Sequence, residues 1–238
     1  EAKIIQIDID SGGIGKIYPA HLAVLGDAKA ILRPLIERLR EAGVRQKTLA
    51  RCGELGRQKN SWREKLSGHR IEHGQAINQW HVYRALRQAI GTEAVVVGAG
   101  GRAELIRRFI APSYVYHSGD MRAIGFGLST AIGLSLAFPA RPVVCVTGDG
   151  SFMLESQELA TAAALKLPIA AIVIRNDAYG NMKRDQIRHY GGRVIGTELY
   201  LPDLCTLATA YGIASARVTE PPALLPAIEK SVASGRPY

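Results

Sequence analysis

Cysteine is scarce in this chain, and its placement excludes two kinds of protein. Three cysteines occur among 238 residues, Cys52, Cys145 and Cys205. They lack the short spacings of a zinc site, and three scattered thiols cannot form the framework of a disulfide-stapled secreted domain. This usage fits a reducing compartment, and no secretory signal is recognisable in the first residues. We therefore expect a cytoplasmic protein.

A long apolar run is also missing. The most hydrophobic stretch, residues 123–138, has 16 residues and contains Ser129, Thr130 and Ser135. A helix needs about 20 apolar residues to cross a bilayer, so this stretch is too short. Its glycine, alanine and serine content is typical of a buried helix that packs closely on a sheet. We expect no membrane partner.

Aromatic residues are few, at 6% of the chain, although the net charge is +9. Residues 33–70 hold eleven Lys or Arg and four Asp or Glu, which is most of the excess. A basic stretch can bind nucleic acid, but neither interleaved aromatic residues nor a binding motif accompanies this one. We expect a solvated surface and no nucleic-acid partner.

What the chain does contain is an alternation of apolar runs and amphipathic stretches, without repeats or low-complexity tracts. Strands are predicted at residues 2–10, 94–97, 114–116, 142–147, 168–174 and 214–218, with Cys145 buried in one of them. Helices are predicted at 27–42, 74–90, from 123, at 155–166, 202–211 and 222–233, with a short one near Trp62. From residue 94 onward, this alternation predicts an α/β fold with a doubly wound parallel sheet and helices on both faces.

Three parts follow from this pattern. Residues 1–42 are interpreted as the C-terminal tail of one α/β domain, 43–73 as a polar, basic linker, and 74–238 as most of a second α/β domain. The chain has no initial methionine and starts inside a strand. Its last residues, 235–238, fall where another strand is expected. We therefore interpret it as a piece of a longer protein.

Oxygen-bearing side chains follow two neighbouring strands. The run 142–147 leads into Gly148-Asp149-Gly150-Ser151, and the run 168–174 leads to Asn176, with 25 residues between Gly150 and Asn176. A helix between the runs completes a βαβ unit, whose right-handed crossover puts both strand ends at the sheet edge where ligands bind. Asp149 and Asn176 can meet there around a hard cation such as Mg²⁺. The adjacent glycines let the backbone approach a ligand closely.

This combination resembles the diphosphate-anchoring motif of thiamine-diphosphate enzymes. The resemblance runs nearly end to end with the acetolactate synthase (acetohydroxyacid synthase) large subunits. It implies a metal held by Asp149, Asn176 and the backbone carbonyl of Ala178. It also implies that the cofactor contacts Gly101, Arg102, Gly150, Ser151, Tyr179, Gly180 and Asn181. Gly150 and Ser151 would offer backbone N–H groups at a helix N-terminus, which suits a diphosphate.

A second stretch carries the same resemblance. Residues 118–127, Ser-Gly-Asp-Met-Arg-Ala-Ile-Gly-Phe-Gly, are similar to the family's Ser-Gly-Gly-Leu-Gly-Ala-Met-Gly-Phe-Gly. In the family a bulky apolar residue sits under the cofactor and forces its two rings into a V. Ile124 matches that residue, with Ala123 and Arg122 beside the pyrimidine. Arg122 replaces a glycine, and the resemblance does not predict what this departure does.

The residues after Asn176 depart from true acetolactate synthases. Those enzymes carry Met five residues after the metal-binding Asn and Trp nine residues after it, whereas this chain has Asn181 and Asp185. Because the Trp selects the second substrate, we expect a paralogue with another acceptor or another acid. Alternatively, Asp185 points into solvent and pairs with Arg184 or Arg188.

FAD is left open as a cofactor. In flavin-containing members of the family, residues matching Asp8, Ile9, Asp27 and Ala28 contact FAD. Polar groups and backbone at strand ends suit ribose and adenine. The two acids also suit a cap at a strand end and at a helix N-terminus, and flavin-free relatives share this framework.

The resemblance implies a thiamine-diphosphate- and Mg²⁺-dependent enzyme that acts on a 2-oxo acid by decarboxylation or carboligation, with the cofactor carrying the hard chemistry. The family's activating glutamate lies in a separate N-terminal domain, supplied by a partner subunit of a homodimer or homotetramer. Nothing in this chain matches it. Glu155 and Glu158 are candidates only by residue type, and we interpret them as helix-surface acids. No catalytic residue is assigned here, and the isolated segment is expected to be inactive.

Three alternatives remain. The first is another 2-oxo acid decarboxylase or lyase of the same family, and the second is a non-catalytic cofactor-binding module, consistent with Arg122 and Asp185. The third is an NAD(P)-binding domain, because residues 98–103, Gly-Ala-Gly-Gly-Arg-Ala, fit the pattern Gly-x-Gly-x-x-Gly/Ala after a valine-rich strand. A dinucleotide fold normally opens on that strand, whereas here a long helix and a linker precede it.

Overall fold

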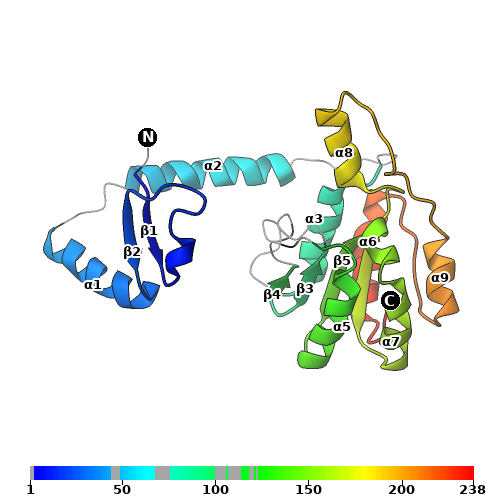
Figure 1. The fold of residues 1–238 in the computed structure, drawn as a ribbon. Helices are drawn as coiled ribbons and strands as arrows, with labels where there is room; N and C mark the ends of the chain where they lie inside the picture. Colours follow the sequence, from blue (N-terminus) through cyan, green and yellow to red (C-terminus); the bar gives the residue numbers. More distant parts are fainter. Residues whose placement is uncertain are drawn as a thin grey trace. The chain divides into compact units, whose positions relative to one another are not determined.

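The computed structural model describes residues 3–43, 49–67, 76–99, 106, 114–117, 121 and 123–238. The chain divides into two compact units, residues 1–68 and residues 69–238 (Figure 1).

The first unit contains two short parallel strands. β1 (Ile5–Asp8) pairs with β2 (Leu22–Leu25). The other elements are η1 (Ser11–Gly13), α1 (Ala28–Glu41) and α2 (Leu49–Ser67). The predicted strand at the start and the predicted helix over 27–42 are confirmed. β2 is not among the predicted strands, because its four residues give too short a pattern.

α2 is longer than the short helix predicted near Trp62. It covers 19 residues of the stretch interpreted as a linker. Leu, Arg, Gln, Glu and Lys, which are good helix formers, supply most of its sequence. Its apolar residues form only a weak stripe, so the periodicity that usually indicates a helix gives little signal.

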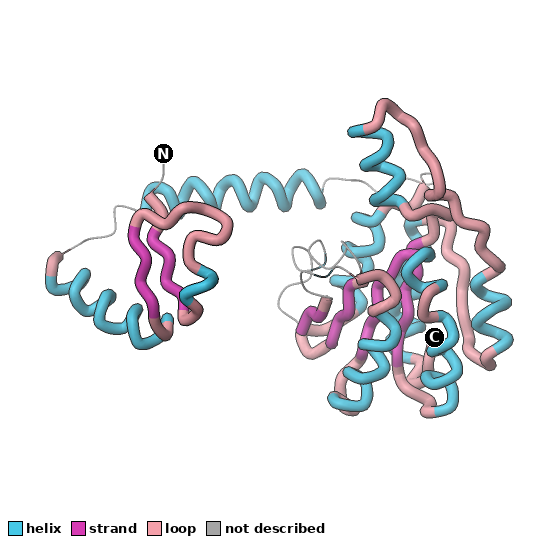
Figure 2. Tube along the Cα trace, viewed as in Figure 1, coloured by secondary structure: helices cyan, strands magenta, loops and turns pink. Residues whose placement is uncertain are grey.

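The second unit is built on a parallel sheet. In the described residues, its strands are β3 (Val95–Gly98), β4 (Tyr114–Tyr116), β5 (Val143–Gly148) and β6 (Ile169–Ile174), in the order β4-β3-β5-β6. The helices are α3 (Gln79–Ala89), α5 (Gly127–Ala137), α6 (Asp149–Met153), η3 (Ser156–Glu158), α7 (Leu159–Ala164), α8 (Gly180–His189), α9 (Leu204–Ala210), η4 (Pro221–Ala223) and α10 (Leu224–Ala233). Figure 2 shows the strands side by side with helices around them. The predicted α/β class is confirmed.

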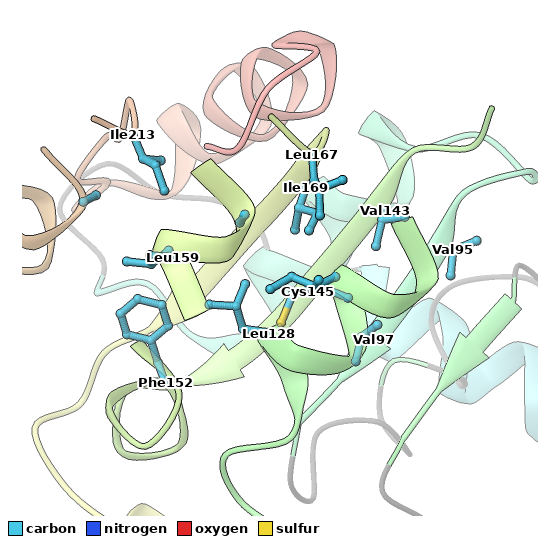
Figure 3. Close-up of a cluster of buried hydrophobic side chains, with 14 residues drawn as sticks. Val95, Val97, Leu128, Val143, Cys145, Phe152, Leu159, Leu167, Ile169 and Ile213 are labelled. Carbon is cyan, nitrogen blue, oxygen red and sulfur yellow. The ribbon is translucent and has the colours of Figure 1, made fainter. Parts of the chain in front are cut away.

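Alternate residues of the central strands enter two apolar cores. Val96 and Val144 share one core with Tyr83 of α3 and Ile228 of α10. The other core, drawn in Figure 3, joins Val95, Val97, Val143 and Cys145 to residues of α5 and α7, such as Leu128 and Leu159. β3 and β5 are therefore covered on both faces, which explains their continuous apolar sequences. Cys145 is fully buried, as predicted.

The predicted helix over 155–166 is divided in the structure. η3 and α7 occupy this range, and α6 precedes them. Where α6 ends, the Ser156 hydroxyl donates to the carbonyl of Met153 at 3.5 Å, and the Gln157 amide donates to that of Leu154 at 3.4 Å. Such local side-chain bonds compete with the regular helical ladder.

The predicted strand at 214–218 is not formed, and residues 213–219 are irregular. Tyr238 instead joins the outer edge of β6: its N–H donates to the Ile169 carbonyl at 3.0 Å, and its carbonyl accepts from the Ala171 N–H at 2.9 Å. An apolar cavity of about 310 Å³ is lined by both β6 and the irregular stretch. The stretch therefore lies along β6 without forming a ladder. Within the described part of the chain, no helix is both long and apolar enough to cross a membrane.

Candidate functional site

The carboxyl ends of β5 and β6 bring Asp149 and Asn176 together. The strands are paired up to Gly148 and Ile174, so both chains leave the sheet at one edge. Asp149 is 2% exposed. Its Oδ2 accepts the N–H of Asn176 at 2.7 Å and that of Asp177 at 2.6 Å, while its Oδ1 accepts the N–H of Gly150 at 2.9 Å. The buried carboxylate thus fixes the chain after β6 against the start of α6.

One end of the Asn176 side-chain amide meets two oxygen atoms. It lies 2.9 Å from the carbonyl oxygen of Ala178 and 3.2 Å from Asp149 Oδ1. If this end is the NH₂ group, it donates a hydrogen bond to each oxygen. If it is the amide oxygen, three oxygens converge and none can donate, so a cation is needed to hold them together. Octahedral Mg²⁺ with ligands at 2.0–2.1 Å would place neighbouring ligand oxygens about 2.9 Å apart, so these residues fit the ion.

The chemistry of these three oxygens suits a hard metal. One carboxylate, one amide and one backbone carbonyl are ligands that Mg²⁺ accepts, with water and phosphate oxygens completing its octahedron. Among the described residues, no group of three or more His, Cys, Asp or Glu could hold a metal. A soft-metal or carboxylate-rich site is therefore not a competing candidate in that part of the chain.

The loop that carries Ala178 is held in place by neighbouring backbone. The Tyr179 N–H donates to the Thr197 carbonyl at 2.8 Å, and the Leu199 N–H donates to the Asp177 carbonyl at 2.9 Å. Asp177 itself has a left-handed φ of 53°, a conformation that Asp tolerates better than most residues. The turn at Asp177 and these two hydrogen bonds fix the direction of the Ala178 carbonyl.

Two glycines leave room for this loop. A Cβ on Gly150 would lie 2.7 Å from the Tyr179 ring, and one on Gly180 would lie 2.6 Å from Nδ2 of Asn176. Both distances are shorter than any tolerable contact. Gly150 thus lets Tyr179 pack directly over the start of α6. Gly180 leaves the space that the Asn176 side-chain amide occupies.

Ile124 lies in a segment that we call the wedge loop, residues 123–127. Its side chain is 49% exposed, which leaves it available to a bound molecule. The next residue, Gly125, has a φ of 73° and donates its N–H to Ser151 Oγ at 2.9 Å. Ala123 is exposed as well. The wedge loop is thereby tied to the helix that begins at Asp149.

Glu155 is not the helix-surface acid that the sequence predicts, because its side chain is 1% exposed. Its Oε2 accepts the N–H of Leu128 at 2.7 Å and that of Ser129 at 3.1 Å. Phe126, at the N-cap of α5, makes no side-chain hydrogen bond, so the first N–H groups of α5 need an acceptor from elsewhere. The sequence does show that the residue before α5, Phe126, cannot cap the helix with its side chain. It does not show which distant residue accepts these N–H groups instead. Glu158 is half-buried.

Burial raises the pKa of the Glu155 carboxyl, although hydrogen bonds from the backbone at residues 127–129 partly oppose this shift. Burial also raises the pKa of the neighbouring Cys145 thiol, and the Glu155 charge adds to that effect. An acid whose pKa is raised on folding binds its proton more tightly in the folded state. Its contribution to the free energy of unfolding is largest below the unfolded pKa and falls as the pH rises through the folded pKa.

We expect Glu155→Gln to remove this pH dependence. The amide oxygen can still accept the two N–H groups, but it carries no charge to bury. Urea unfolding between about pH 4 and pH 7, a window that starts near the unfolded pKa of glutamate, should show the variant gaining stability relative to the parent as the pH rises. Glu158→Gln is the matched control and should follow the parent. A stability difference that stays constant over this window would contradict the prediction.

A comparison with known proteins identifies the family of this chain. The family model described as "Thiamine pyrophosphate enzyme, C-terminal TPP binding domain" matches residues 98–238, which is 141 of the 238 residues. The chain belongs to the thiamine pyrophosphate enzyme family. This membership excludes the NAD(P)-binding alternative for the glycine-rich stretch after β3.

Relatives of this thiamine pyrophosphate enzyme carry acetolactate synthase names. The chain is 32% identical to the acetolactate synthase isozyme 3 large subunit of Escherichia coli, over 92% of this chain and 39% of that protein. It is 30% identical to a probable acetolactate synthase large subunit of Methanocaldococcus jannaschii, over 100% of this chain and 41% of that protein. It is 29% identical to acetolactate synthase 1, chloroplastic, of Nicotiana tabacum, over 100% of this chain and 37% of that protein. The chain thus spans about two fifths of the length of these curated relatives.

In this thiamine pyrophosphate enzyme, the residues that replace the family's Met and Trp lie on α8, beyond the carboxyl ends of the strands (Figure 1). Asn181 accepts a hydrogen bond from Arg184 Nη2 at 2.9 Å. Asp185 is exposed, and no ion pair to it is formed within the described residues. The pairing of Asp185 with Arg184 or Arg188, which the sequence leaves open, is therefore absent from the described contacts.

Some predicted site residues cannot be placed. Gly101, Arg102 and Arg122 lie outside the described residues, so their contacts with the cofactor stay predictions. The Gly150 N–H, predicted to face a diphosphate, is used by Asp149 Oδ1 in this structure.

The four residues matched to a flavin site lie at the ends of β1 and β2. Asp8 accepts the N–H of Asp10 at 3.0 Å, and Asp27 caps α1 by accepting the N–H of Ala30 at 2.9 Å. Ile9 is 74% exposed, and Ala28 is the first residue of α1. The capping role that the sequence offers as an alternative is thus present for Asp27.

Proposed function

We propose that this chain is the cofactor-binding part of an enzyme that uses thiamine diphosphate and Mg²⁺ to decarboxylate a 2-oxo acid and join the product to a second carbonyl compound. The observation that carries the proposal is the meeting of Asp149, Asn176 and the Ala178 carbonyl at one sheet edge, where one end of the Asn176 amide lies 2.9 Å from the Ala178 oxygen and 3.2 Å from Asp149 Oδ1. The acetolactate synthase names of the relatives support the same reaction class.

Different residues of this chain would hold different parts of the cofactor. Asp149, Asn176 and the Ala178 carbonyl would hold Mg²⁺, which neutralises the diphosphate. Ile124, exposed on the wedge loop, would support the rings, and Tyr179 with Gly180 and Asn181 would cover the diphosphate. When bound, the cofactor supplies a carbon nucleophile that stabilises the charge left by departing CO₂. The protein's own contribution is orientation, charge neutralisation and exclusion of water.

The proposal includes a partner subunit. Nothing in this chain matches the glutamate that activates the cofactor in the family, so we propose a homodimer or homotetramer in which another domain supplies it. Sparse cysteine usage supports a cytoplasmic enzyme. FAD stays an open component, because two of the four residues matched to it, Asp8 and Asp27, accept hydrogen bonds from nearby backbone N–H groups.

The proposed enzyme differs from a branched-chain biosynthetic enzyme in its acceptor, the second substrate. An aromatic wall selects by shape and apolar contact, and one methylene is then worth about 1–3 kcal/mol. Asp185 offers a carboxylate instead, which would repel a second 2-oxo acid anion and favour polar, uncharged acceptors. This observation also supports the second candidate, a decarboxylase or lyase of the same family with another acid as substrate.

We expect the intact enzyme to turn over a 2-oxo acid with thiamine diphosphate and Mg²⁺, but without a strong preference for 2-oxobutyrate over pyruvate as acceptor. The measurement is product identification in a competition between the two acids. Asp185→Trp should raise the share of the 2-oxobutyrate product, whereas Asp185→Asn, which removes only the charge, should not. A strong preference for 2-oxobutyrate in the unmodified enzyme would show that it is the biosynthetic enzyme after all.

A further inference from the structure

Two side chains downstream of Asp149 hold the wedge loop and the start of α5. Ser151 Oγ accepts the N–H of Gly125 at 2.9 Å. Glu155 Oε2 accepts the N–H of Leu128 at 2.7 Å and that of Ser129 at 3.1 Å. Ser151 and Glu155 stand four positions apart and are 7% and 1% exposed. These three hydrogen bonds join the segment that begins at the metal-binding residue to the segment that carries Ile124.

The carboxylate of Glu155 is well suited to hold α5. Its oxygen accepts the first N–H groups of α5, which have no partner within the helix. Burial opposes the charged form of the side chain, but an acceptor oxygen is present in both protonation states. Glu155 comes from a different part of the chain, 27 positions beyond Leu128. It therefore connects two segments, which a local cap cannot do.

The start of α5 has no room to move away from this carboxylate. A Cβ on Gly127 would lie 3.0 Å from the Ala99 Cβ, 3.0 Å from the Cys145 Sγ and 3.4 Å from Glu155 Oε1. The first turn of α5 is thus pressed onto the ends of β3 and β5 with Glu155 beside it. Loss of the acceptor oxygen at residue 155 must therefore be transmitted to the wedge loop.

We propose that Glu155 and Ser151 are positioning residues that set Ile124 relative to the metal-binding residue Asp149. The proposal rests on the proposed function, since it assigns the Asp149 end to the diphosphate and the Ile124 end to the rings. Loss of either side chain leaves the metal ligands in place but frees the wedge loop. Binding of the whole cofactor should then weaken, while binding of its diphosphate part should not.

The test is calorimetry on the intact protein with two probes, thiamine diphosphate with Mg²⁺ and inorganic pyrophosphate with Mg²⁺. Glu155→Ala should weaken thiamine diphosphate about tenfold, the equivalent of one lost cap of typical strength, and leave pyrophosphate unchanged. Glu155→Gln, which keeps the acceptor oxygen, should restore the affinity for thiamine diphosphate. Glu158→Ala is the matched control, because Glu158 is on η3 but its side chain accepts a hydrogen bond only from Thr161 within the described contacts. Thermal unfolding checks that each variant is folded.

The outcomes separate this proposal from the function on which it rests. If the unmodified protein binds neither probe, the proposed function fails. If it binds both and Glu155→Ala weakens both equally or neither, the positioning role is overturned. The same conclusion follows if Glu155→Gln is as weak as Glu155→Ala. If Glu155→Ala does not fold, Ser151→Ala makes the same comparison, because it removes only the hydroxyl that holds Gly125. If Ser151→Ala then changes the affinities for both probes by the same factor, or changes neither, the proposal is overturned.

Discussion

Asp149→Ala is expected to abolish Mg²⁺-dependent binding of thiamine diphosphate. The buried carboxylate has two functions in the structure: Oδ1 is one of the three oxygens facing the metal position, and Oδ2 accepts the N–H groups of Asn176 and Asp177. Removal of a residue that only supports a metal ligand typically lowers affinity about 10–100-fold, so loss of a ligand should exceed that range. The measurement is calorimetric titration of the cofactor at saturating Mg²⁺.

Two further variants make the result specific to the metal. Asp149→Asn keeps acceptor oxygen for the loop but removes the charge, so it should fold better than the alanine variant and still bind poorly. Asp177→Asn is the matched control: Asp177 is adjacent to the site, but its carboxylate pairs with Arg175 Nε at 2.8 Å and is half exposed. It should bind as the parent does. Unchanged affinity in a folded Asp149→Ala protein would rule out the proposed metal site.

The second expected result is that the isolated 238-residue chain does not decarboxylate pyruvate, even with saturating thiamine diphosphate and Mg²⁺. A positioned acid or base contributes typically about 10²–10⁴-fold to such a step, and the family takes this group from another domain. Glu155, the buried glutamate among the described residues, has its Oε2 engaged by the Leu128 and Ser129 N–H groups of α5. Without the glutamate of the other domain, the chain therefore lacks most of the protein's contribution to the rate of decarboxylation.

The assay is CO₂ release by the chain compared with free cofactor, and with the Asp149→Ala chain as the matched control. All three should give the same rate. Calorimetry on the same sample shows whether the cofactor is bound, so inactivity with binding supports the proposal. A rate above that of the free cofactor, abolished by Asp149→Ala, would mean that an acid within this chain activates the cofactor.

The sheet and the meeting of Asp149 with Asn176 were accessible from the sequence because both depend on short-range rules. Apolar runs of strand length mark β3, β5 and β6, and the hand of a βαβ unit fixes which strand ends share an edge. The adjacency of Asp149 and Asn176 then follows without any knowledge of side-chain packing. The resemblance to thiamine-diphosphate enzymes predicted that this edge binds a cofactor, and family membership agrees with it.

The features that could not be predicted depend on contacts between distant segments. Glu155 has the sequence context of a surface acid, and only the packing of α5 on its neighbours makes it a buried cap. The stretch 214–218 has the composition of a strand, but a strand needs a partner edge. The edge of β6 at Ile169 and Ala171 is already paired with Tyr238. α2 has helix-forming residues without a clear apolar stripe, so a pattern-based reading sees only a linker.

The side chain of Asn176 gives the site two self-consistent states that share one backbone. Without a cation, the amide NH₂ can close the ring of oxygens by donating to Ala178 and Asp149; with a cation, a half-turn about the terminal side-chain bond presents the oxygen instead. Loading would then require no refolding of the chain, because the hydrogen bonds around Asp177 and Tyr179 hold the loop in both states. The two amide protons of Asn176 become a direct spectroscopic reporter of occupancy: slowly exchanging and hydrogen-bonded in the metal-free protein, and released from both oxygens on titration with Mg²⁺.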